Sequence, residues 1–531
     1  MYTAFDDPSR WVLPAVLAEQ AATRGEWNWV TTTQGEAWTF AQAWREVRQA
    51  AAWFELQGVR PGDTVALMAG NGLDFIRAWL GLGTLGAVVV LLNTELHGSF
   101  LEHQLANCGA RLAVVDAELA PAVIAAARAA PQLEAIAICG AGPQDVDCGR
   151  LERLAWQDWR NAPPYEGPLP AAADIACIMY TSGTTGPAKG VLMPHAHCTL
   201  FGIGACEAAR LADGDSYYIV LPLFHANGLL MQLVATLIAG IPAIVRPKFS
   251  AAAWLPDVRR YGVTVTNMLG VVASYVIAQP ATLCDADHRL RLVMSAPNMP
   301  DNEAAFRSRF GVRDVMSGYG MTEVNIPIWG ACGESRPGAA GKPYARYFDV
   351  IVADPERDTE VPRGQVGEIL VRPKLPFGFM QGYHAMPDKT VEAWRNLWFH
   401  TGDAAVMDAD GVVTFIDRIK DCIRRRGENI SATEVEAVIA RFDGVAEVAA
   451  YAVPATISGG EDEVMLSIVR APGAAFEAAD LLAYADAALP RFAQPRFVAF
   501  VDALPKTANG KVQRMALRRA GTAGAFDRVA K

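Results

Sequence analysis

The chain has 531 residues, a length that calls for more than one folded unit, and 52% of them are hydrophobic, enough for a large core. It carries 47 Lys and Arg against 57 Asp and Glu, and the net charge of −10 argues against general nucleic-acid binding. Nine cysteines show neither a CxxC pair nor metal-ligand spacing, which is typical of reduced thiols in a cytosolic protein.

The N-terminal residues have no basic region followed by an apolar one, so no signal peptide is predicted. The longest mostly apolar run, residues 78–92, is shorter than the roughly 20 residues of a membrane span. We therefore expect a cytoplasmic protein without a transmembrane segment.

The N-terminal part alternates between helical and extended patterns. Helices are predicted at 12–23 and 40–56, around a short strand at 27–32, and Thr39 can cap the second helix. Beyond them, strands and helices alternate at 64–68, 73–82, 88–92, 101–107 and 112–115. Such alternation predicts βαβ units around a parallel sheet.

The stretch 180–191, YTSGTTGPAKGV, follows a buried strand predicted at 175–179. Glycine lets the backbone approach phosphate oxygens closely. Hydroxyl donors and one positive charge come from Ser182, Thr184, Thr185 and Lys189. The spacing differs from Walker A, because only two residues separate Gly183 from Gly186. By composition alone the stretch also fits a flexible surface loop.

Strand and helix patterns continue to residue 317. After a helix at 194–212, a strand at 217–221 runs into Pro222-Leu223-Phe224-His225, where the histidine suits a general base, a ligand or a wall residue. An apolar helix is predicted at 229–239. Further strands are predicted at 242–245, 263–269, 290–294 and 314–317, and the third of these leads into Ser295-Ala296-Pro297. In open α/β sheets, ligands bind at such strand ends.

Three more motifs carry polar groups. Tyr319-Gly320-Met321-Thr322-Glu323 follows a strand and offers a phosphate donor and a hard oxygen ligand suited to Mg²⁺. Asp403 ends the motif at 398–403, and an aspartate in such a turn usually caps the backbone. Lys511 lies in PKTANGKVQR, a polar turn in which a lysine is ordinarily solvated.

From residue 422 the pattern changes to a small α+β unit. A helix at 432–441 follows Ser431, which fits a capping box with Glu434. Strands are predicted at 445–453, 464–469 and 497–500, with a helix at 478–488. The connection, Asp417-Arg418-Ile419-Lys420-Asp421, is a charged run that would ordinarily form a solvated face.

Taken in order, these motifs resemble the adenylate-forming (AMP-binding) superfamily, and the similarity covers nearly the whole chain. PLFHANG, DADHRLRLVMSAP and RRRGENIS are most similar to crotonobetaine/carnitine-CoA ligases, among related fatty and aryl acyl-CoA ligases. The resemblance implies an α/β fold with a large N-terminal AMP-binding domain (1–418) of stacked, mostly parallel sheets with helices. It also implies a hinge (419–421) and a small mobile α+β C-terminal domain (421–531).

The resemblance implies an ATP-dependent acyl-CoA synthetase that uses Mg²⁺ and takes coenzyme A as co-substrate. It gives catalytic roles to Lys511, Thr185, Glu323 and His225, the last as a gate, and metal ligation to Glu323 and Thr185. Nucleotide binding falls to Thr181, Ser182, Gly183, Thr184, Thr185, Gly186, Lys189, Ser295, Ala296, Pro297, Ser317, Gly318, Tyr319, Gly320, Met321, Thr322, Asp403, Arg418, Lys420, Gly427 and Glu428. Within this set, Asp403 binds the ribose hydroxyls and Lys420 is the hinge residue.

One position departs from the family pattern. Arg424 stands where some relatives have a lysine shortly before the Gly-Glu pair, so no lysine role is assigned there.

Two other functions stay open. The chain could load an acyl group onto a carrier, which would be a separate protein because only 20 residues follow Lys511. It could also be a non-catalytic nucleotide-binding or scaffolding homologue. Against this argues the presence of Glu323, Asp403, Arg418 and Lys511.

The acid and the oligomeric state, including a homodimer, are left open by the sequence. The expected pocket segments are 225–231, 268–273 and 325–329, which are mostly small or apolar. Their polar handles are Asn227, Asn325 and Trp329. These segments predict a predominantly apolar acid.

Overall fold

The computed structural model describes residues 1–140, 142, 146–181, 187–418, 422–455, 461–505 and 512–529, with only the backbone of residues 417, 418, 422 and 429. Several predicted site residues lie outside this description: Ser182, Gly183, Thr184, Thr185, Gly186, Lys420 and Lys511.

One sheet of eight strands has the order β19 (Gly382–Tyr383), β9 (Lys189–Pro194), β8 (Ile175–Thr181), β4 (Val88–Leu91), β3 (Thr64–Met68), β5 (Leu112–Asp116), β6 (Ala135–Cys139) and β7 (Glu152–Leu154). From β8 to β7 all neighbours are parallel, whereas β9 is antiparallel to both β8 and β19. The hairpin from β8 to β9 encloses the glycine-rich loop.

A second sheet has nine strands, in the order β16 (Lys342–Pro343), β15 (Asn325–Gly330), β14 (Asp314–Met321), β13 (Leu292–Ala296), β12 (Val265–Leu269), β10 (Tyr217–Ile219), β11 (Ala243–Val245), β1 (Asn28–Thr32) and β2 (Ala37–Thr39). Strands β14, β13, β12, β10, β11 and β1 run parallel, and the outer pairs are antiparallel. The carboxyl ends of the parallel strands therefore meet at one edge, as in open α/β sheets.

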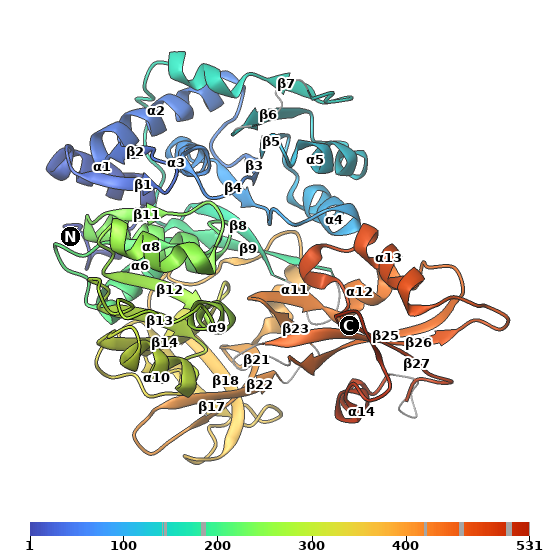
Figure 1. The fold of residues 1–531 in the computed structure, drawn as a ribbon. Coiled ribbons are helices and arrows are strands. Elements are labelled where there is room, and N and C mark those ends of the chain that lie inside the picture. The colour runs from blue at the N-terminus through green and yellow to red at the C-terminus, as the bar shows by residue number, and fades with distance from the viewer. Residues whose placement is uncertain are drawn as a thin grey trace.

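Helices follow the strands of both sheets in Figure 1. The α-helices are α1 (Leu13–Arg24), α2 (Phe40–Leu56), α3 (Leu73–Leu85), α4 (Gly98–Cys108), α5 (Ala120–Ala126), α6 (His195–Ala209), α7 (Val234–Ala239), α8 (Ala251–Arg260), α9 (Gly270–Ile277) and α10 (Pro300–Ser308). Short 3₁₀ turns are η1 (Pro8–Arg10), η2 (Ala127–Ala129) and η3 (Trp156–Asn161). Thr39 caps α2, as predicted, in a capping box with Gln42.

The prediction of one helix at 229–239 is wrong about the kind of helix in its first half. It begins as a π-helix, η4 (Asn227–Leu233), and becomes α-helical only in α7. Such turns are rare and are frequent at functional sites.

A third, antiparallel sheet has the order β17 (Phe348–Ala353), β18 (Val366–Pro373), β21 (Trp398–Met407) and β20 (Trp394–Arg395), and β22 (Val413–Arg418) also pairs with β21. The short helix α11 (Pro387–Ala393) precedes β20. In this sheet, the backbone of Asp403 pairs with that of Arg418.

The C-terminal unit begins with the hairpin β23 (Cys422–Arg425) and β24 (Glu428–Ser431). Its sheet has the order β25 (Val445–Pro454), β26 (Asp462–Arg470), β27 (Phe497–Phe500) and β28 (Phe526–Asp527). The helical segments are α12 (Ala432–Ile439), α13 (Ala478–Ala488), η5 (Arg491–Ala493) and α14 (Arg514–Ala520). The unit lies at the right of Figure 1, with α13 beside α4.

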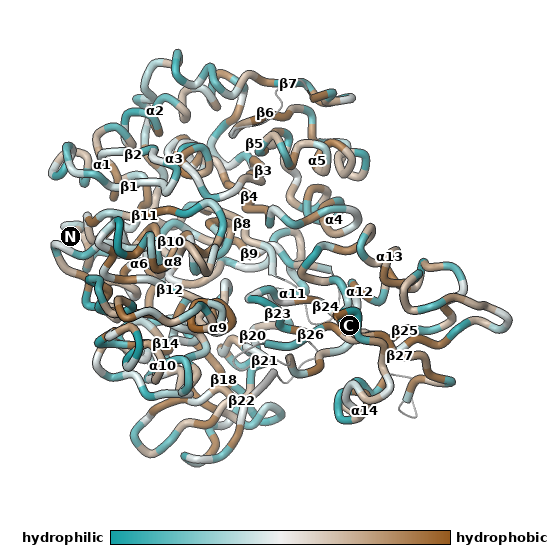
Figure 2. The backbone as a smooth tube through the Cα atoms, in the orientation of Figure 1, coloured by the Kyte–Doolittle hydropathy of each residue, from teal (hydrophilic) through white to brown (hydrophobic). Residues whose placement is uncertain are grey.

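The hydrophobic core joins these layers. One cluster of buried side chains contains residues of both large sheets together with α3 and α6, and both helices are buried almost along their whole length. A second cluster joins the eight-stranded sheet and α4 to α12 and α13. Figure 2 shows α9 as an almost unbroken hydrophobic segment. The predicted α/β fold, with large mixed sheets and a small α+β C-terminal unit, is confirmed.

Candidate active site

A cavity of about 1220 Å³ lies at the carboxyl edge of the nine-stranded sheet. The ends of β12, β13 and β14 form one side, the hairpin from β8 to β9 forms another, and the small C-terminal unit forms a third. Of the predicted site residues, those that line it are His225, Thr181, Lys189, Ala296, Pro297, Ser317, Gly318, Tyr319, Gly320, Met321, Thr322, Glu323, Asp403, Gly427 and Glu428. Ser295 is fully buried instead, and its hydroxyl donates to the carbonyl of Pro297 over 3.1 Å.

Glu323 is held at the turn between β14 and β15. Its side chain is only 4% exposed, and its Oε1 accepts from Thr181 Oγ1 at 3.0 Å and from Tyr383 OH at 3.1 Å. Burial and the Glu323 carboxylate both raise the pKa of Tyr383, so its hydroxyl keeps the proton that it donates. Both bonds arrive at Oε1, and no hydrogen bond within the described residues reaches Oε2.

The positive charge of Lys189 lies over the ring of Tyr383, the tyrosine that bonds to this carboxylate. Its Nζ is 4.1 Å from the centre of the Tyr383 ring, a cation–π distance. Tyr383, on β19, therefore links Lys189 to Glu323. The sequence analysis did not predict a role for this residue. The only local signal was an aromatic residue in a Gly-Tyr pair, which has many other uses.

Asp403 lies on β21, across the cavity from the loop hairpin. It is 2% exposed, and its Oδ2 accepts from Tyr319 OH at 2.6 Å. The Tyr319 ring is also nearly parallel to that of Phe415, with centroids 6.3 Å apart and planes 24° apart. Phe415, on β22, also lines the cavity and was not predicted.

Glycine at 318 and 320 lets β15 pack closely against this motif. A Cβ on Gly320 would lie 2.3 Å from the carbonyl oxygen of Asn325, and one on Gly318 would lie 3.1 Å from the Trp329 ring. Any larger residue would displace the Tyr319–Glu323 segment from its place in the wall.

The small unit enters the cavity through the turn between β23 and β24. Gly427 has φ +83°, where a residue with a side chain is strained, and a Cβ there would also push the Leu269 side chain aside, since it would lie 2.3 Å from Leu269 Cδ1. Next to it, Glu428 Oε1 accepts from His225 Nε2 at 2.7 Å and from Asn93 Nδ2 at 2.9 Å. Burial lowers the pKa of His225, but the facing Glu428 carboxylate outweighs it and raises the pKa above its ordinary value. His225 is thus a contact between the two units.

Two predicted pocket handles do not face the cavity. Asn325 is 2% exposed and donates to the carbonyl of His197, and Trp329 packs against Gly204 of α6. Asn227 is the third handle, and it does line the cavity. His197 lies behind the wall, where burial lowers its pKa to about 4 and keeps it neutral.

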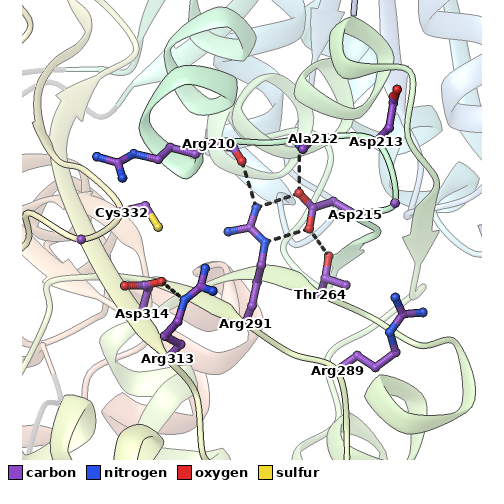
Figure 3. Close-up of a pocket in the computed structure, with 12 residues that line it drawn as sticks. Arg210, Ala212, Asp213, Asp215, Thr264, Arg289, Arg291, Arg313, Asp314 and Cys332 are labelled. Atoms are coloured by element: carbon purple, nitrogen blue, oxygen red, sulfur yellow. Dashed lines mark hydrogen bonds and ion pairs between the residues drawn. The ribbon is translucent and has the colours of Figure 1, made fainter.

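A second hollow, of about 690 Å³, lies at the opposite edge of the same sheet (Figure 3). Its centre is an ion pair in which Arg291 donates to both oxygens of Asp215, at 2.7 and 2.8 Å. Asp215 also accepts from Thr264 Oγ1 at 2.8 Å. These groups tie together the amino ends of β10, β12 and β13, so we assign the pair a structural role.

The residues that line the cavity suit Mg²⁺, an ion that needs few protein ligands. In the described part of the chain, no group of three or more His, Cys, Asp and Glu side chains could hold a metal ion. Glu323 lines the cavity with one carboxylate, which suits Mg²⁺, because this ion binds one or two carboxylates and completes its shell with phosphates and water.

Two protein-family models match the chain. The model described as "AMP-binding enzyme" covers residues 17–384, and "AMP-binding enzyme C-terminal domain" covers residues 434–511. The chain belongs to the AMP-binding enzyme family. The resemblance seen in the motifs is thereby confirmed: the chain is an adenylate-forming enzyme of a family that binds ATP. No helix of the described ranges is long and apolar enough to cross a bilayer.

Relatives of this AMP-binding enzyme have diverse names. The "Crotonobetaine/carnitine--CoA ligase" of Salmonella typhi is 30% identical over 489 residues, covering 90% of this chain and 93% of the relative. The solved anthranilate CoA ligase AuaEII, in complex with anthranoyl-AMP, has a TM-score of 0.73 and 27% identity, covering 98% of both chains. ATP-bound MatB from Rhodopseudomonas palustris has a TM-score of 0.70 and 27% identity, covering 96% of this chain and 99% of MatB.

Proposed function

We propose that this AMP-binding enzyme is an AMP-forming acyl-CoA synthetase. It activates a carboxylic acid as an acyl-adenylate, releases pyrophosphate, and transfers the acyl group to the thiol of coenzyme A. The observation that carries the proposal is one cavity in which Glu323, Lys189 and Asp403 of the large domain face the Gly427–Glu428 turn of the small domain.

In the first step, a carboxylate oxygen attacks the α-phosphorus of ATP, and the bond to the bridging oxygen of pyrophosphate breaks. Both reactants are anions, so the site must neutralise charge as the transition state forms. Lys189 and the N–H and hydroxyl groups of the glycine-rich loop would bind the phosphates, and Lys511 would supply positive charge where the carboxylate meets the α-phosphate. Asp403 accepts from the ribose hydroxyls, with Arg418 as a further nucleotide contact.

Glu323 and Thr185 are the proposed ligands of Mg²⁺, which supplies positive charge at the phosphate oxygens. The Thr181 and Tyr383 hydroxyls hold Glu323 Oε1 and so orient the carboxylate. Neither donor belongs to the small domain, so this orientation does not depend on domain position.

In the second step, the sulfur of coenzyme A attacks the acyl carbon, and AMP leaves with the bonding electrons. The large domain (1–418) and the small domain (421–531) turn about residues 419–421 between the two steps, with Lys420 as the pivot. The turn at Gly427 and Glu428 lines the cavity, and we assign this arrangement of the two domains to the second step.

The acid is predominantly apolar. Its side of the cavity is lined by Phe201, Met231, Leu269, Met294 and Ile326. An unpaired charge on the acyl chain would lose its hydration there without a partner.

The test is a screen of the purified chain with ATP, Mg²⁺ and a panel of medium-chain, aromatic, alicyclic and betaine acids. Pyrophosphate release that depends on an apolar acid is expected, followed by a thioester with free coenzyme A. A phosphopantetheinylated carrier protein serves as the competing acceptor. If a thioester forms only on the carrier protein, the carrier replaces coenzyme A as the acceptor. If pyrophosphate release does not depend on an added acid, the proposed activity is contradicted.

A further inference from the structure

A buried chain of amide groups ends at Asn227, on the π-helix η4. Tyr217 OH donates to Asn267 Oδ1, and Asn267 Nδ2 donates to Asn227 Oδ1 over 3.0 Å. Gln232 Nε2, from the same π-helix, also donates to Asn227 Oδ1, over 3.2 Å. Tyr217, Asn267 and Gln232 are almost fully enclosed, whereas Asn227 lines the cavity.

The direction of this chain follows from Tyr217. Its hydroxyl is buried and stays protonated, since burial raises the pKa of Tyr217, and its proton needs an acceptor. Asn267 Oδ1 is that acceptor, so Asn267 presents its Nδ2 to Asn227. Asn227 Oδ1 therefore receives two donors, and the planar amide turns Nδ2 the opposite way.

Asn227 Nδ2 is consequently a donor that faces the ligand space. Within the described ranges no protein atom accepts from it, and it is not among the enclosed polar atoms that lack a partner. Gln232 Oε1 is such an atom: it is fully enclosed and has no partner in the described residues. A polar chain with an unmatched oxygen destabilises a wall that apolar side chains could fill, so packing alone does not account for it.

We propose that Asn227 Nδ2 donates a hydrogen bond to an uncharged acceptor oxygen on the acyl chain. This rests on the proposed function and narrows it: the preferred acid is apolar except for one carbonyl or ether oxygen at a fixed distance from its carboxylate. Asn227 is then a specificity residue, while Tyr217 and Asn267 act through it as positioning residues.

The test uses sets of acids of equal length in wild-type enzyme. In each set a methylene group is replaced by an ether oxygen or by a carbonyl, at successive positions along the chain, and kcat/KM for pyrophosphate release is measured. At one position the oxygenated acid is expected to exceed its alkyl counterpart by roughly threefold to tenfold, the effect of one net hydrogen bond. No preference at any position, with the alkyl acids still active, overturns this inference and leaves the proposed function standing.

Asn227→Leu removes the donor at similar volume and should abolish the preference, measured as the ratio of kcat/KM for each oxygenated acid to that for its alkyl counterpart. Met231→Leu is the matched control in the same wall, and it should alter alkyl and oxygenated acids equally. An equal loss for all acids in Asn227→Leu, with an unchanged melting temperature, would place the donor on the common carboxylate and overturn the inference. If wild-type enzyme releases pyrophosphate with no acid, the proposed function falls and this inference with it.

Discussion

The cavity has one wall from the large domain and one from the small domain, and different contacts hold the two walls in place. Glu323 and Asp403 are each fixed by hydroxyls of their own domain, from Thr181, Tyr383 and Tyr319. Glu428 of the small domain bonds instead to His225 and Asn93 across the boundary. The first wall, here called the permanent wall, is held within the large domain. The second, here called the docked wall, is held by contacts between the domains, which the proposed rotation would break.

This difference has a consequence for function. Under the proposed rotation, groups on the permanent wall would serve every step in which the nucleotide is bound, while groups of the small domain would serve only the step for which they are docked. Substitutions on the two sides should therefore separate the half-reactions in different ways.

The largest effect is expected for Lys511→Ala. Lys511 lies outside the described residues, and its proposed charge is needed only where the carboxylate meets the α-phosphate. Adenylate formation should fall about a thousandfold or more. Thioester formation from a supplied acyl-adenylate should stay close to normal. Equal losses in both half-reactions would contradict this division of roles.

Glu323→Gln tests the permanent wall. Loss of the carboxylate charge should reduce adenylate formation by about a hundredfold to a thousandfold, because the phosphates lose their proposed Mg²⁺ anchor. The fold should be retained, since Gln still accepts from Thr181 and Tyr383. Pyrophosphate release at several Mg²⁺ concentrations measures the effect. Glu392→Gln, at the exposed rim beside Lys389, is the matched control and should behave as wild type.

Glu428→Gln tests the docked wall. A neutral amide weakens the bond to His225, whose imidazole is favoured in its charged form by the Glu428 carboxylate. Thioester formation should fall about tenfold, the effect of one charge-assisted hydrogen bond, and adenylate formation should not change. Single-turnover assays of each half-reaction measure this, and a loss confined to adenylation would reverse the assignment.

The same contrast explains what the sequence could reveal. The alternation of strands and helices predicted the sheets, because hydrophobic period and turn residues are local properties. The main motifs predicted the permanent wall, although Thr181 and Glu323 are far apart in the chain. Tyr383 and Asn93 were missed, because their roles come only from tertiary contacts with Glu323 and Glu428.

The error at Asn325 and Trp329 has a simple geometric cause. Residues four apart on a strand share one face, and in β15 that face packs on α6, while Ile326 on the other face lines the cavity. A shift of register by one residue would exchange the two faces. Composition of the segment 325–329 does not reveal which register the hairpin from β14 to β15 adopts.

The smallest predicted effect concerns Glu434, on the docked side. Its backbone N–H donates to the Ser431 hydroxyl, which is one half of the predicted capping box. Its carboxylate accepts from the Ala188 N–H of the large domain at 3.0 Å, and among the described residues the structure gives no capping box at this helix. Burial in this contact raises the pKa of Glu434 from an ordinary 4.5 to about 7. The docked arrangement therefore holds a proton that an undocked Glu434 would release. Below about pH 4.5, Glu434 is protonated in both arrangements and does not affect the free energy of docking. As the pH rises to about 7, docking becomes less favourable, because an undocked Glu434 gains stability by ionising. Above about pH 7 this cost is constant.

Glu434→Gln keeps an acceptor for Ala188 but cannot ionise. Its rate of thioester formation, divided by that of wild type, should therefore increase as the pH rises. We expect the ratio of the two rates to increase roughly threefold between about pH 5.5 and 8, far below the limit of tenfold for each pKa unit, because docking controls only part of the rate. Taking the ratio removes the ionisation of the coenzyme A thiol, which affects both enzymes alike. Asp443→Asn changes an exposed carboxylate just beyond α12 and should give a constant ratio. If Glu434→Gln also gives a constant ratio, its carboxyl group is not buried by docking during thioester formation, and the contact with Ala188 belongs to another state of the enzyme.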